Sequence, residues 1–160
     1  MITSMQQIME LESYKTLEFF GTRAIVSIIA GLIIGIERTM SSHPAGIKTL
    51  VFVSLGSCMF ATLSFYLHVM YPATDPTRIL GQIITGIGFL GAGVIFHQNS
   101  IKVSGLTSAS IIWVACSLGI IAGSGLFLVP IFAAGTIVLI TYLLRRLERA
   151  IEPKDDTTKE

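Results

Sequence analysis

The sequence predicts an all-α integral membrane protein, a bundle of about five transmembrane helices. Of its 160 residues, 52% are hydrophobic and 13% are charged, whereas about a quarter of a soluble domain is charged. No acidic residue occurs between Asp75 and Glu148, and Arg78 and Lys102 are the only basic residues between Asp75 and Arg145. The apolar runs that remain reach the roughly 18 residues that read as a transmembrane helix. A soluble helical core would need polar faces that these runs lack.

The runs divide the chain into three parts: an N-terminal interfacial segment at 1–18, a transmembrane domain at 19–145 and a charged cytoplasmic tail at 146–160. In the first part, apolar residues recur at helical spacing, which fits either a short helix at the membrane interface or a frayed terminus. We expect a polar loop at 37–46 and Arg23 reaching the lipid headgroups. The expected helices lie at 19–36, 47–70, 76–96, 106–123 and 125–144.

Five spans place the two termini on opposite sides, and basic residues favour the cytoplasmic side of a membrane. The side of the C-terminal tail holds the larger basic set: Arg38, Lys48, Lys102, Arg145, Arg146, Arg149, Lys154 and Lys159. The other side holds Lys15, Arg23 and Arg78. We therefore expect the N-terminus outside and the C-terminus in the cytoplasm. The acidic N-terminus lacks the basic region of a cleavable signal peptide.

The run at 75–96 contains four glycines, at Gly86, Gly88, Gly91 and Gly93. In a helix interior each glycine costs about 1 kcal/mol relative to alanine. In a membrane, small residues let helices approach closely, so we interpret this run as the central helix of the bundle. Similar small-residue ridges occur on the first and fourth helices, at Ser27, Gly31 and Gly35 and at Ala115, Gly119 and Gly123.

Several chemistries are disfavoured. Gly86 to Gly91 reads G-x-G-x-x-G, but a dinucleotide site needs a preceding strand and an acidic residue about 20 positions later. The net charge of +1 gives no argument for nucleic acid binding. Cys58 and Cys116 lie in apolar segments and are expected to be packing residues. No nucleophile with a partner base is evident, so we do not expect an enzyme.

Two groups of polar residues are the candidate functional motif. Glu37 follows the first helix, where a negative charge opposes the helix dipole by about 0.3–1 kcal/mol. Arg38 or Lys48 could compensate it, either as an ion pair that sets helix depth or in a functional role. Asp75 can cap the third helix, with Pro76 in its first turn.

The second group continues from that cap onto one face of the third helix. This face carries the polar side chains of Arg78, Gln82 and Thr85 near the start of the helix. Farther along it carries Gly86 and Gly93, where no side chain projects. Polar groups in membrane helices often mark functional positions.

Magnesium binding would require oxygen ligands, usually one or two carboxylates. Glu37 and Asp75 are the candidate metal ligands, but the expected topology places them at opposite faces of the membrane. We therefore expect no resident cofactor, and Mg²⁺ at most as an effector or a substrate.

The chain resembles the MgtC/SapB family of bacterial inner-membrane proteins in four segments: G-L-I-I-G-I-E-R at 31–38, A-G-I-K-T at 45–49, D-P-T-R-I-L-G-Q-I-I-T-G-I-G-F-L-G-A-G-V-I at 75–95 and G-L-T-S-A at 105–109. The resemblance implies a five-helix membrane domain linked to growth under magnesium limitation. It also implies restraint of ATP synthase in some members. The motif residues carried over are Glu37, Arg38, Asp75, Arg78, Gln82 and the glycines of the third helix.

The chain departs from the family pattern at two positions and in length. Lys48 stands where many members have arginine, which would lose a bidentate contact, and Thr107 replaces a frequent asparagine. The chain resembles a short form without the soluble cytoplasmic domain of longer members. Functions that depend on that domain are not expected here.

Three functions fit these observations. The first is a non-enzymatic membrane protein that supports magnesium or other ion homeostasis by regulating a membrane partner. The second is a transporter that moves Mg²⁺ or another small ion through the bundle. The third is a purely structural role, in which the glycine faces only build a homo-oligomer within the lipid bilayer.

Overall fold

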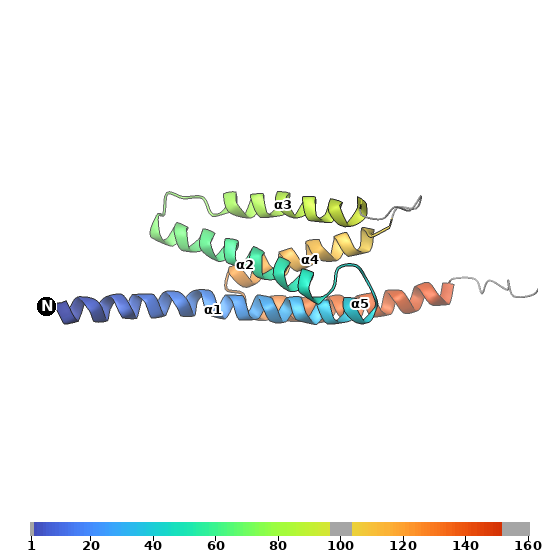
Figure 1. Ribbon diagram of the computed structural model, residues 1–160, viewed down its shortest axis with the longest axis horizontal. Helices are drawn as coiled ribbons and strands as arrows, with labels where there is room; N and C mark the ends of the chain where they lie inside the picture. Colours follow the sequence, from blue (N-terminus) through green and yellow to red (C-terminus); the bar gives the residue numbers. More distant parts are fainter. Residues whose placement is uncertain (1, 97–103, 152–160) are drawn as a thin grey trace, which may run out of the picture.

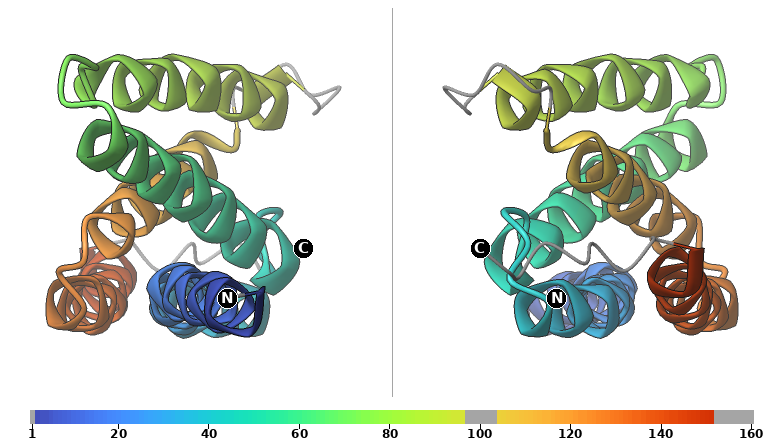
Figure 2. Two further views of the ribbon diagram at one scale, coloured as in Figure 1. Left: turned by 90° about the vertical axis from the view of Figure 1, so that its left-hand side faces the viewer. Right: turned by 90° about the vertical axis from the view of Figure 1, so that its right-hand side faces the viewer.

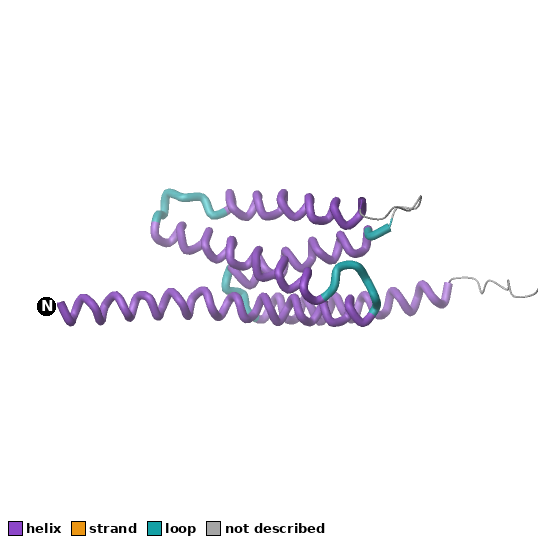
Figure 3. The backbone as a smooth tube through the Cα atoms, in the orientation of Figure 1, coloured by secondary structure: helices purple, strands orange, loops and turns teal. Residues whose placement is uncertain are grey.

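A computed structural model describes residues 2–96 and 104–151. These residues form five α-helices: α1 (Ile2–Met40), α2 (Ile47–Met70), α3 (Thr77–Phe96), α4 (Leu106–Gly123) and α5 (Leu128–Ile151). Short loops join α1 to α2, α2 to α3 and α4 to α5 (Figure 3). Each helix contains a segment long and apolar enough to cross a membrane. The predicted all-helical, multi-pass architecture is confirmed.

The helices form three layers. α2 and α4 cross each other in the middle, with α1 and α5 on one side and α3 on the other (Figures 1 and 2). The two ends of the described chain lie at opposite ends of the bundle (Figure 1). Within the described residues α3 contacts α2 and α4, but neither α1 nor α5. The prediction that the glycine-rich run is the central helix is therefore wrong.

The central layer is built from small residues. Most of the buried positions of α2 are Ser, Cys, Ala or Thr, and Ala, Gly, Ser and Cys recur among those of α4. A side chain at Gly119 would overlap the carbonyl oxygen of Ser54, and a Cβ at Gly123 would lie 2.8 Å from the carbonyl oxygen of Cys58. The backbones of α2 and α4 are thus in direct contact, as small residues allow in membrane helices.

The same packing joins α1 to α2. A Cβ at Gly31 would lie 2.9 Å from the Cα of Val51, and one at Gly35 would lie 2.8 Å from the Cα of Ile47. The hydroxyl of Ser54 donates to the carbonyl of Ser27 at 2.9 Å. The buried hydroxyl of Ser54 therefore finds its acceptor on the backbone of the neighbouring helix, which removes the cost of an unpaired buried donor.

α1 is longer at both ends than the sequence suggested. Residues 2–18 continue the same helix, and the helix ends at Met40, not at residue 36. Glu37 and Arg38 therefore lie on the last turn of α1 and not in a loop. The chain turns after them, where Ser42 adopts φ 54°. The start of α5 also differs, because Gly125 occupies a turn at φ 93° and the helix begins at Leu128.

Arg23 contacts the end of another helix of the bundle, α4, and that it reaches the lipid headgroups stays a prediction. Its Nε donates to the carbonyl of Gly123 at 3.1 Å, and its guanidinium carbon lies 3.6 Å from the ring centroid of Phe19. A cation is favourable at the C-terminal end of a helix such as α4, where carbonyl groups lack intrahelical partners. Cys58 and Cys116 are buried free thiols in the packed interior, as predicted.

Candidate functional site

Polar residues gather at one end of the bundle, where α1 and α2 meet and α4 begins. A pocket of about 330 Å³ lies there between α1, α4 and α5, which we call the Arg38 pocket. Its polar lining consists of Arg38, His43, Thr107, Thr141, Arg145 and Glu148. Its apolar lining consists of Ile111, Ile137, Ile140 and Leu144. Three helices and the loop after α1 thus contribute to one site.

Glu37 is held beside this pocket by α5. Arg145 Nη2 lies 2.5 Å from Glu37 Oε1, and Arg145 Nη1 donates to the Ser41 hydroxyl at 2.5 Å. The Ser41 hydroxyl in turn donates to Glu37 Oε1 at 3.1 Å. The cation that forms a salt bridge with Glu37 is therefore Arg145, which the sequence does not suggest. Of the two predicted cations, Arg38 interacts with Glu37 electrostatically, whereas Lys48 lies exposed.

Arg38 is buried in an unusual way. The residue is only 1% exposed, and its Nε and Nη2 atoms have no hydrogen-bond partner in the part of the chain that the structure describes. His43 Nδ1 is also buried without a partner there. Burial, followed by the positive charges of Arg38 and Arg145, lowers the pKa of His43 below its ordinary value. The site therefore holds a charged guanidinium with two donor nitrogens that lack acceptors in the described part of the chain. It also holds a neutral imidazole with one ring nitrogen that lacks a hydrogen-bond partner within the described residues.

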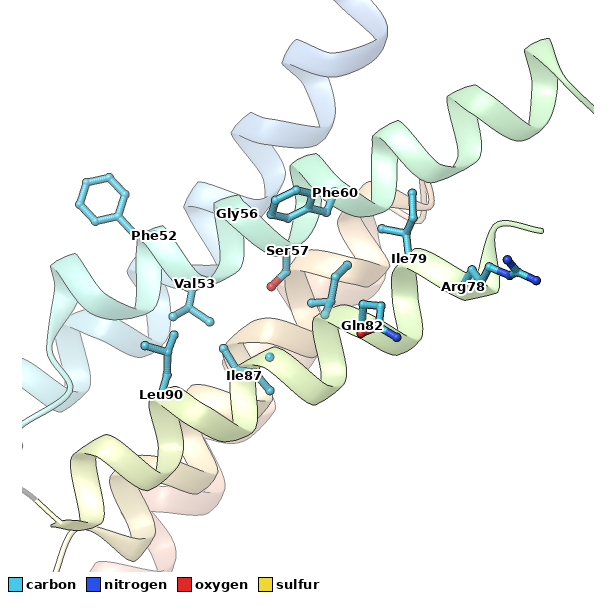
Figure 4. A pocket seen from close by; sticks show the side chains of 12 residues that line it. Phe52, Val53, Gly56, Ser57, Phe60, Arg78, Ile79, Gln82, Ile87 and Leu90 are labelled. Atoms are coloured by element: carbon cyan, nitrogen blue, oxygen red, sulfur yellow. The ribbon is translucent and has the colours of Figure 1, made fainter. Parts of the chain in front are cut away.

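The second group of polar residues lies along a groove between α2 and α3 (Figure 4). The groove has a volume of about 760 Å³. Arg78 and Gln82 lie toward one end of it, and its other lining side chains are almost all apolar (Figure 4). Gly56 on α2 and Gly86 on α3 also line it, and a Cβ at either position would meet nothing within 4 Å. This groove brings Arg78, Gln82 and Gly86 together.

Asp75 is engaged at the start of α3. Its Oδ1 accepts hydrogen bonds from the backbone N–H of Thr77 at 2.9 Å and from the Thr77 hydroxyl at 2.7 Å. These two bonds lower the pKa of the Asp75 carboxyl. Capping at Asp75 agrees with its predicted role at this helix end.

The structure does not bring the two candidate metal ligands together. Asp75 lies just before α3, and Glu37 lies in the last turn of α1, at the opposite end of the bundle (Figure 1). Within residues 2–96 and 104–151 no three His, Cys, Asp or Glu side chains cluster as a metal site would require. The Arg38 pocket and the α2–α3 groove are therefore separate candidate sites.

The glycines singled out from the sequence fall into two classes. Gly31, Gly35, Gly119 and Gly123 lie against neighbouring backbone, and Gly91 lies beside the side chain of Ala109. At Gly86, Gly88 and Gly93 on α3, a Cβ would meet nothing within 4 Å. The glycine face of α3 at these three positions therefore packs against no other described part of the chain.

His43 and Arg145 are functional candidates that the sequence does not single out. The three histidines are dispersed along the chain and suggest no common site, and Arg145 reads only as the start of a basic tail. A basic residue near the C-terminal end of the last span is nevertheless a signal for Arg145, because a charge at that depth needs a partner.

Comparison with known proteins identifies the family. The MgtC family profile matches residues 25–150. Protein SapB of Bacillus subtilis is 36% identical over 72% of this chain and 52% of its own length. A putative magnesium transporter, YhiD, of Escherichia coli K12 is 36% identical over 80% of this chain and 61% of its own length. Protein MgtC of Brucella abortus is 34% identical over 79% of this chain and 51% of its own length.

The chain therefore spans little more than half the length of these curated relatives. No solved structure matches it significantly. The family profile covers all of α2, α3 and α4 and most of α5, including both candidate sites. By this match, the five-helix membrane protein described here belongs to the MgtC family.

Proposed function

We propose that this protein is a non-enzymatic component of the bacterial plasma membrane that supports magnesium homeostasis by regulating a membrane-protein partner. The observation that carries this proposal is the open groove between α2 and α3. The glycines between α1, α2 and α4, in contrast, are packed directly against neighbouring backbone. A groove with open glycines on both walls suits a helix that packs closely against them.

The occupant we propose is a single transmembrane helix of a different membrane protein. Arg78 is exposed at one end of the groove and forms no salt bridge with any residue that the structure describes. A partner helix with an acidic residue at the same depth would supply the complementary charge, and the apolar walls suit the rest of that helix. ATP synthase is the first partner to examine, as the family resemblance suggests, and a second copy of this chain is the alternative occupant.

The test fills the groove from both walls. Gly56→Leu and Gly86→Leu place a large side chain into the groove, and at neither position does a Cβ meet an existing atom. Gly135→Leu on α5 is the matched control, because its Cβ position is equally open. In a strain that depends on this protein, both groove variants should lose growth in low magnesium, whereas Gly135→Leu should grow like wild type at equal membrane abundance. Equal growth of all three would overturn the docking proposal.

The orientation belongs to the same proposal. We place the end with Arg38, Lys48 and Arg145 in the cytoplasm, because it carries the larger share of basic residues. A cysteine introduced at Lys48 should react with a membrane-impermeant maleimide only after the cells are opened. A cysteine at Lys15, in contrast, should react in intact cells.

Transport of Mg²⁺ through the bundle is the second candidate function. It is favoured by one observation, namely that a relative 36% identical to this chain is named a putative magnesium transporter. Its carboxylate ligands would be Glu37 and Asp75, yet Glu37 is paired with Arg145 and Asp75 caps α3. Both acids would have to give up these bonds during transport, which makes regulation the better supported function.

A further inference from the structure

We propose that the Arg38 pocket binds the phosphate group of a phospholipid. This inference does not depend on how the protein acts on magnesium, since it concerns the opposite end of the bundle from Arg78 and the cap of α3. It rests on the state of the Arg38 side chain, the helix end beside it and the depth of the pocket in the membrane.

Arg38 needs an acceptor. Two of its nitrogen atoms are buried and lack partners within the described residues, and burying a charged donor without a partner costs more than a neutral hydrogen bond contributes. An oxyanion supplies several acceptor oxygens and a compensating charge, and guanidinium–phosphate contacts are among the strong hydrogen bonds. Arg38 lines a pocket of about 330 Å³ that could hold such a group.

The start of α4 lies at the same pocket. This 18-residue helix begins at Leu106 after Gly105, which has φ 85° and, as a glycine, provides no side-chain cap. Thr107, in its first turn, lines the pocket. The positive end of the helix dipole favours an anion at this position.

Arg38 forms no salt bridge with any residue that the structure describes, because Glu37 is paired with Arg145. Glu37 still acts on Arg38 electrostatically, and Glu148 lies exposed on α5 at the rim of the pocket. His43 contributes a ring nitrogen that has no partner within the described residues. An arriving phosphate would therefore meet two nitrogens of Arg38 that have no partner in the described chain, the start of α4 and the His43 imidazole. Of the other charged residues in the lining, Arg145 would attract the phosphate and Glu148 would repel it.

The depth of the pocket favours a lipid as the source of the phosphate. The apolar span of α1 ends at Met40, two residues beyond Arg38, and that of α4 begins at Leu106. Arg38 therefore lies where the headgroups begin. Ile140 and Leu144, which line the pocket, are 48% and 53% exposed on α5. Phosphate beside Arg38 with an acyl chain along these two residues matches this mixture of polar and apolar lining.

The test uses the purified full-length protein and native mass spectrometry with three probes: dioctanoyl phosphatidylglycerol, dioctanoylglycerol without phosphate, and inorganic phosphate. We expect the phospholipid to bind, dioctanoylglycerol to bind at least about tenfold more weakly, and inorganic phosphate to bind weakly. Binding of inorganic phosphate with no preference for the lipid would overturn the lipid source and assign the pocket to free phosphate. Equal binding of both dioctanoyl lipids would overturn the phosphate site.

Variants separate the pocket from general surface charge. Arg38→Gln should weaken phospholipid binding about tenfold or more, and Arg38→Lys should restore part of it. Ile140→Trp fills the pocket from α5 without altering a charge and should weaken binding similarly, which keeps the test valid if Arg38→Gln does not fold. Arg146→Gln, an exposed cation one position from Arg145, should bind like wild type. Wild-type binding by folded Arg38→Gln, or by Ile140→Trp, would contradict the proposal and show that the phospholipid does not bind in this pocket.

Discussion

Arg145 Nη2 lies 2.5 Å from Glu37 Oε1, an ion pair that ties the last helix to the end of the first across 108 sequence positions. The two side chains are only 30% and 15% exposed, so water screens the pair less than a surface salt bridge. Removing one partner leaves the other charge poorly solvated.

We predict that Arg145→Ala lowers the free energy of unfolding by about 1.5–3 kcal/mol, the range for hydrogen bonds to charged groups. Denaturation in detergent, followed by helical circular dichroism, measures this change. A double-mutant cycle with Glu37→Ala should give a coupling energy of about 0.5–3 kcal/mol, and additive single effects would show that the pair is not coupled. Arg146→Ala is the control.

Gly119→Ala should be among the most destabilising conservative substitutions in the chain. Its Cβ would overlap the backbone of Ser54, which cannot rotate away as a side chain can. We expect a loss of about 3 kcal/mol, the upper end of the usual cost of overpacking. Gly135→Ala has open space around it and should be neutral or stabilising by up to about 1 kcal/mol. The midpoints of thermal unfolding of the two variants decide this, and similar midpoints would contradict the contact between α2 and α4.

Stability should fall as the pH is lowered through about 6.5, the ordinary pKa of histidine, because of His43. Burial and the facing charges of Arg38 and Arg145 lower its pKa in the folded protein, and Glu37 only partly opposes them. The unfolded chain then takes up a proton that the folded chain does not, so the free energy of unfolding decreases with falling pH. His43→Gln should reduce this slope. The variant keeps Glu148, the acidic residue in the lining of the same pocket.

The control for this prediction lies at the other end of the bundle. His68→Gln removes an imidazole whose Nδ1 lies 2.7 Å from the carbonyl oxygen of Thr74, and it should preserve the contribution of His43. A pH slope that is the same in wild type and His43→Gln would show that His43 does not titrate between the folded and unfolded states.

Arg23→Met should loosen α4 from α1. It removes the bond from Nε to the carbonyl of Gly123 and the stacking on Phe19 while keeping an apolar side chain of similar length. We expect a loss of about 1.5–3 kcal/mol in unfolding free energy. Lys15→Met, on the same helix but exposed, should change it by less than about 0.5 kcal/mol. Equal effects of the two would indicate that Arg23 acts only through the membrane surface.

The five spans could be predicted from composition because apolar length alone decides what crosses a bilayer. The close contacts at Gly31 and Gly119 were also accessible, since small residues every four positions indicate a face that another helix can approach. The glycines of α3, which are more densely spaced, are misleading, because small residues show that a helix can be approached but not by which neighbour. The pairing of Glu37 with Arg145 could not be read from the sequence, since it depends on how α1 and α5 align at their ends. The burial of Arg38 was missed for a related reason: a charge near the end of a span normally reaches the headgroups.

The central claim is that this protein supports magnesium homeostasis through a partner and does not carry the ion itself. The measurement that tests it most directly is Mg²⁺ uptake into liposomes that contain the purified, folded protein, beside Glu37→Gln and Asp75→Asn. We predict the same uptake with wild type, with both variants and with protein-free liposomes. Uptake above protein-free liposomes that disappears in either variant would contradict the claim and establish a transporter.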